Sequence, residues 1–100
     1  MKMLIEQTVR KEARRNEEMI RQYEGLISEL PKGSLVCKKT GYYYLKYRRG
    51  GKVCDKYIGK DAENIAALRE KIDERKHCEE MLRALRGEQK AISKILESFA

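Results

Sequence analysis

The spacing of apolar residues changes twice along the chain, and this constrains the fold more than any other feature. Up to Leu30 the apolar residues recur at steps of three, four or seven, which is helical spacing. Three short runs between Ser34 and Ile58 have strand character, and helical spacing returns after Asp61. The sequence therefore predicts an α+β fold: a long N-terminal helix, a three-stranded antiparallel β-meander and a long C-terminal helix.

The length of 100 residues suits a single domain over 1–100. Its predicted parts are a helix over 1–30, a basic meander over 31–60, and one or two helices over 61–100. Pro31 ends the first helix because the residue before a proline avoids the α region. Asp61 is a good N-cap for the last segment. Gly87 predicts either a bend there or a junction of two helices, since glycine costs about 1 kcal/mol relative to alanine.

The strands are expected at Ser34–Lys38, Tyr42–Arg48 and Val53–Ile58. Lys39-Thr40-Gly41 is typical of a three-residue hairpin loop, and Gly50-Gly51 of a two-residue primed turn. The second turn pairs Arg49 with Lys52, Lys46 with Asp55 and, at the far end, Tyr43 with Ile58.

Alternation along the two strands then defines two faces. We expect the inner, core-facing side to carry Tyr43, Leu45, Tyr47, Cys54 and Ile58, with Lys56 reaching out past the sheet edge. The outer side is expected to carry Tyr44, Lys46, Arg48, Val53, Asp55 and Tyr57. A slip of one residue in register would exchange the two faces.

The net charge of +7 is confined to the middle third of the chain. Residues 1–30 hold six Lys/Arg and six Asp/Glu, residues 61–100 hold eight and nine, but residues 31–60 hold nine and one. The flanks are therefore balanced like solvated helices, and the meander carries the whole excess.

Cations interleaved with tyrosines suit nucleic acid, since cations neutralise phosphates and aromatic rings offer stacking or sugar contacts. The candidate nucleic-acid-binding residues are Lys38, Tyr44, Lys46, Arg48, Arg49, Lys52 and Tyr57. A second interpretation stays open: lysine guards edge strands against aggregation, and tyrosine is a good strand former. The sequence does not choose between DNA and RNA.

The sequence gives little support to a catalytic site, a cofactor site or a metal site. The phosphate-loop spacing is absent around Gly50-Gly51, and His77 lies in a charged helical stretch. Cys37 and Cys54 are expected on opposite edge strands, too far apart along them for a disulfide or a shared metal ion. No apolar run is long enough for a membrane span, so a cytoplasmic protein with reduced thiols is the expectation.

The stretch "LPKGSLVCKKTGYYYLKYRRGGKVCDKYIGK" resembles a set of small, uncharacterised bacterial and phage proteins built as helix, tyrosine-rich strands and charged helix. A looser similarity links it to the arm-type DNA-binding domains of phage-type integrases. That second resemblance implies a three-stranded sheet entering the major groove, with Tyr44, Lys46, Arg48 and Tyr57 near DNA. The chain lacks the integrase catalytic domain and has a long helix before its sheet.

These observations favour a non-enzymatic nucleic-acid-binding accessory protein from a phage-like or mobile-element setting. The alternative is a protein-interaction module, such as an antitoxin-like partner or a small inhibitor of a nucleic-acid enzyme. Because the predicted meander is too small to cover both helical seams, a homodimer through the helices is also expected.

Overall fold

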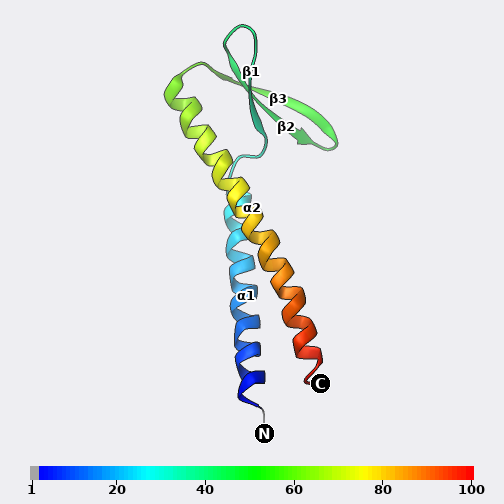
Figure 1. Cartoon of the computed structure of the whole chain (residues 1–100). Coiled ribbons are helices and arrows are strands. Elements are labelled where there is room, and N and C mark those ends of the chain that lie inside the picture. The colour runs from blue at the N-terminus through cyan, green and yellow to red at the C-terminus, as the bar shows by residue number, and fades with distance from the viewer. Residues whose placement is uncertain (1–2) are drawn as a thin grey trace. The chain divides into compact units, whose positions relative to one another are not determined.

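The structure, a computed structural model, describes residues 3–100. Its elements are α1 (Leu4–Glu29), β1 (Ser34–Cys37), β2 (Tyr43–Arg49), β3 (Lys52–Gly59) and α2 (Ala62–Glu97) (Figure 1). The α+β architecture is the one that the sequence predicts, and no strand end is displaced by more than one residue. Residues 1–2 of the predicted first helix lie outside the described residues.

The helix ends follow from local chemistry. α1 ends at Glu29, two residues before Pro31. The guanidinium of Arg75 donates a hydrogen bond of 2.8 Å to the carbonyl oxygen of Leu30, one of the acceptors that the end of α1 leaves free. At the start of α2 the amide of Glu63 donates to Asp61 Oδ1 at 3.0 Å, which confirms Asp61 as the N-cap.

α2 is one uninterrupted helix of 36 residues. It continues through Gly87, so the structure has a single helix there rather than two. No heavy atom lies within 4 Å of where a Cβ on Gly87 would stand, so no close contact explains the glycine.

The chain forms two compact units. We call Glu29–His77 the sheet unit, and the chain up to Ser28 together with Cys78–Ala100 the helical unit. α2 contributes its first part to the sheet unit and its remainder to the helical unit. Among residues 3–100, no helix has the length and apolar character needed to span a bilayer.

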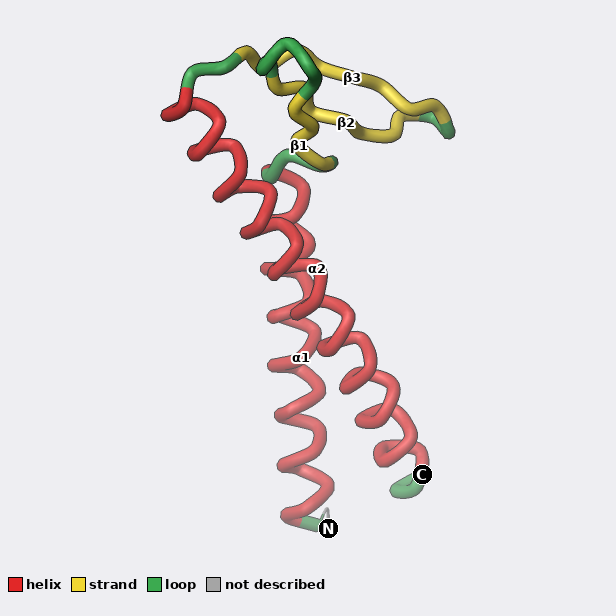
Figure 2. Tube along the Cα trace, turned by 45° about the horizontal axis from the view of Figure 1, so that its top comes forward, coloured by secondary structure: helices red, strands yellow, loops and turns green. Residues whose placement is uncertain are grey.

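The three strands form a twisted antiparallel meander in the order β1-β2-β3 (Figures 1 and 2). β2 and β3 pair Arg49 with Lys52 and keep the predicted register as far as Tyr44 and Tyr57. Beyond that point the prediction is wrong, because a β-bulge between Tyr43 and Tyr44 places Tyr43 opposite Gly59 rather than Ile58.

Each unit has a small core of its own. In the sheet unit Leu45 of β2 is buried, as are Ile65 and Ile72 of α2. In the helical unit the buried apolar residues are Ile20, Cys78 and Leu85. The inner face of the sheet is therefore the one that carries core residues, which leaves the opposite face to solvent.

Candidate nucleic-acid interface

The two faces of the β2–β3 hairpin differ in exposure as alternation requires. On the inner face Leu45 is buried, while Tyr47 and Cys54 are half-buried. On the outer face Lys46 is exposed and Tyr57 is 58% exposed. Lys56, the one charged residue of the inner side, is exposed.

Four cations gather on the outer face and at the turn that closes it. We call Lys46, Arg48, Arg49 and Lys52 the basic cluster. Arg49 and Lys52 pair directly across the Gly50-Gly51 turn, where both glycines have positive φ as a primed turn requires. All four side chains are exposed, and none forms an ion pair with a carboxylate among residues 3–100. The cluster can therefore neutralise an external polyanion without first breaking an internal contact.

Lys38 is placed differently from the basic cluster. Its Nζ lies 3.5 Å from Asp55 Oδ2 and 4.1 Å from the centroid of the Tyr44 ring. Asp55 stands opposite Lys46 in the register, as predicted, but its ion pair is with Lys38. Lys38 thus covers one face of Tyr44 and shares its charge with the single acid of the outer face.

Aromatic rings form a connected cluster beside Lys38. Tyr44 and Tyr57 meet edge to face with centroids 5.5 Å apart, and Tyr42 lies 5.9 Å from Tyr57 at a tilt of 40°. Lys60 Nζ stands 5.2 Å from the Tyr42 centroid. We call Tyr42, Tyr44 and Tyr57 the tyrosine cluster. Sequence reasoning missed Tyr42 and Lys60, although the alternation that selected Tyr44 also places Tyr42 on the outer side.

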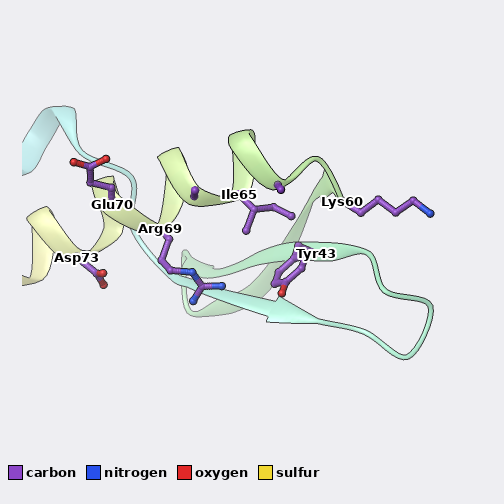
Figure 3. Close-up of a pocket in the computed structure, with 8 residues that line it drawn as sticks. Tyr43, Lys60, Ile65, Arg69, Glu70 and Asp73 are labelled. Atoms are coloured by element: carbon purple, nitrogen blue, oxygen red, sulfur yellow. The ribbon is translucent and has the colours of Figure 1, made fainter.

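An open groove of about 540 Å³ lies on the other side of the sheet, between β2 and the first turns of α2. Ile65 and Arg69 point from α2 toward the strands, and the Tyr43 ring stands beneath them (Figure 3). Lys60 extends away from the groove. The groove has an apolar floor with charges at its rim, and it belongs wholly to the sheet unit.

A family model matches residues 9–67, which is more than half of the chain. The chain belongs to the DUF6788 family. Its description is a domain of unknown function, so membership assigns no activity. No curated protein and no solved structure matches the chain significantly.

The DUF6788 match covers the features of the candidate interface. It contains all three strands and therefore the basic cluster and the tyrosine cluster. It ends within the first turns of α2 and does not reach the C-terminal part of the helical unit, which begins at Cys78. The candidate interface thus lies within the matched residues.

The cysteines of this DUF6788 protein are all free thiols. Cys37 stands opposite Tyr43 and Cys54 opposite Tyr47, so they lie on separate edge strands at different levels, as the register predicts. Within residues 3–100 no three His, Cys, Asp or Glu side chains gather in a way that could hold a metal ion.

Proposed function

We propose that the protein is a non-enzymatic nucleic-acid-binding accessory protein that uses the outer face of its sheet. The observation that carries this proposal is the exposed basic cluster, whose four cations make no ion pair with the described residues of the chain. Cations left unneutralised on a small surface attract phosphates, and binding releases the counterions that had condensed on the nucleic acid.

The geometry of the aromatic rings favours backbone contacts over base stacking. Lys38 covers one face of the Tyr44 ring. The rings of Tyr44 and Tyr57 meet edge to face, so they do not form a parallel platform on which bases could stack. Tyr57 is the most exposed ring of the tyrosine cluster. The cluster therefore suits sugar and phosphate contacts from tyrosine hydroxyls, with Tyr57 offering the main exposed ring surface.

The test is binding of fluorescently labelled duplex DNA, single-stranded DNA and RNA at two salt concentrations. Four phosphates neutralised on a duplex predict a slope of log K against log salt of about −3.6, or roughly a 150-fold loss of affinity from about 50 to 200 mM. Changing Lys46, Arg48, Arg49 and Lys52 together to Ala should remove most of this salt dependence.

A matched control removes the same charge from the helical unit. Arg14, Arg83, Lys90 and Lys94 are exposed and supply the same two arginines and two lysines. Their joint change to Ala should leave binding close to that of the wild type. If the two quadruple variants lose affinity equally, net charge rather than the basic cluster accounts for binding, and the site is wrong. If the wild type binds none of the three polymers, the function is wrong.

The open groove beside Tyr43 favours a second candidate, a protein-interaction module. In that case the basic cluster would hold an acidic protein surface, and a partner side chain would enter the groove beside Ile65. Ile65 is itself part of the core, so the better test is Ala66→Arg, which fills the groove from an exposed position. Stoichiometric capture of one protein after nuclease treatment, lost with Ala66→Arg, would support this candidate over nucleic acid.

A further inference from the structure

The helical unit has one apolar flank and one polar flank. On α2 a stripe of apolar residues recurs at steps of three, seven and four: Met81, Ala84, Ala91 and Ile95. Such spacing places them on one side of the helix, and Met19 and Leu26 are likewise seven residues apart on α1. A groove of about 370 Å³ is lined by Met19, Met81 and Ala84, so the two stripes adjoin. We call this side the apolar flank.

The opposite side of the same helix pair is polar. Its groove, of about 450 Å³, is lined mostly by hydrophilic side chains: Glu17, Gln89, Lys90, Ser93, Lys94 and Glu97, with Ala13, Asn16, Ile92 and Leu96 toward the core. Charged residues are present on both flanks, since Glu12, Arg15 and Glu88 line the groove of the apolar flank beside Met19, Met81 and Ala84.

The apolar flank is incompletely covered within one chain. Leu26 is 45% exposed and Ile95 is 46% exposed, each in the last turn of its helix. Two helices running antiparallel can bury only the residues between them, here Ile20, Cys78 and Leu85 (Figures 1 and 2). Covering the flank would remove apolar surface from water at about 25 cal/mol per Å².

Asn16 provides a second, independent observation in the seam between the two helices. It is only 2% exposed, and its Nδ2 donates a 2.9 Å hydrogen bond to the carbonyl oxygen of Leu85. Its Oδ1 is buried with no hydrogen-bond partner among the described residues, and Asn16 lies between the two helices, where it lines the grooves of both flanks. A buried acceptor without a donor is costly, and a polar residue in a helical seam commonly fixes the register and the number of helices that assemble.

The charges of the helical unit identify the occupant. Its described residues hold nine Lys/Arg and nine Asp/Glu, so it attracts neither a strongly acidic nor a strongly basic partner. At the groove, Arg15 of α1 and Glu88 of α2 are exposed, opposite in sign, and without an ion pair among residues 3–100. In a two-fold interface every contact occurs twice, so Arg15 of each copy can meet Glu88 of the other, which makes the pair self-complementary.

We propose that a second copy of this chain docks on the apolar flank and forms a four-helix homodimer. The interface buries Leu26 and Ile95 of both copies, and Arg15 of each copy faces Glu88 of the other. The proposal does not rest on nucleic-acid binding, since it concerns the helical unit alone.

The test is the molar mass of the full chain by sedimentation equilibrium over a wide concentration range. The wild type should reach the mass of a dimer. The variant Leu26→Glu/Ile95→Glu should stay monomeric, because its dimer would bury four carboxylates, two from each copy. The control Gln7→Glu/Ser93→Glu adds the same charge at exposed positions away from the flank and should dimerise like the wild type. A wild type that stays monomeric throughout, or a Leu26→Glu/Ile95→Glu variant that dimerises normally, overturns the proposal.

Charge reversal tests the same interface without touching its apolar residues. Arg15→Glu and Glu88→Arg should each weaken dimerisation several-fold, because each places like charges together twice per dimer. The double variant Arg15→Glu/Glu88→Arg should restore it. If the double variant is as weak as the sum of the single changes, Arg15 and Glu88 do not meet and the docking geometry is wrong.

Discussion

At the scale of single residues, the outer face of the sheet follows from alternation, but the contacts on it do not. The Gly50-Gly51 turn sets the register, and the register assigns Lys46 and Arg48 to the exposed side. Lys38 could not be placed in this way, because its long side chain crosses to Asp55 on a strand with which β1 does not pair. Sequence spacing predicts the face on which a side chain leaves the backbone, but it does not predict where the charged end of a long side chain lies.

Asp55 gives the residue-scale prediction. Its carboxylate is the one acid of the outer face, and it holds Lys38 by a half-exposed ion pair that contributes little stability. Asp55→Asn should strengthen nucleic-acid binding roughly threefold, since a carboxylate about 7 Å from a phosphate repels it by roughly 0.6 kcal/mol in water. Fluorescence anisotropy at low salt measures the change.

The control for Asp55→Asn is Glu70→Gln, which removes the same charge from an exposed position on α2. Its effect on affinity should be smaller. Unchanged or weaker binding by Asp55→Asn would mean that phosphates do not approach this part of the sheet.

At the scale of elements, the sequence predicts the helices and most of the sheet correctly. Pro31 and Asp61 mark the inner ends of the two helices because each acts through its own backbone or side chain. The bulge at Tyr43 was not predictable in the same way, because it lies at the last pair of β2 and β3 and leaves the register of every other pair unchanged. The single helix through Gly87 has an energetic reason: one glycine costs about 1 kcal/mol, which a helix of 36 residues can absorb.

Gly33 gives the element-scale prediction. Its φ of +123° is disfavoured for residues with a side chain, and a Cβ there would collide with the carbonyl oxygen of Lys46. Gly33→Ala should therefore destabilise the sheet unit by about 2–4 kcal/mol, combining backbone strain with a clash. This requirement accounts for the glycine of the LPKGSL stretch. Urea denaturation followed by circular dichroism measures the loss.

Gly87→Ala is the matched comparison for Gly33→Ala. Gly87 lies inside α2 with open space around its missing Cβ, so the same substitution should stabilise the helix by up to about 1 kcal/mol. Opposite shifts of the two unfolding midpoints are expected. A Gly33→Ala protein as stable as the wild type would show that the backbone before β1 relaxes freely.

At the scale of the whole molecule, charge and apolar surface are divided between the units. The described residues of the helical unit are electrically balanced, whereas the sheet unit holds thirteen Lys/Arg and seven Asp/Glu. The sequence predicts this segregation of charge directly. The position at which the units divide, between His77 and Cys78, could not be predicted, because α2 crosses it without a glycine or a proline.

The three cysteines differ in accessibility, and each reports on a different part of the molecule. Cys37 is exposed on β1, whereas Cys78 is 3% exposed in the core of the helical unit. With Cys37 and Cys54 changed to Ser, the rate at which a maleimide modifies the remaining thiol measures how often the two helices part. If dimerisation holds the two helices together, the rate of modification should fall as the protein concentration rises. A rate independent of concentration would show that the helices open within each chain regardless of association.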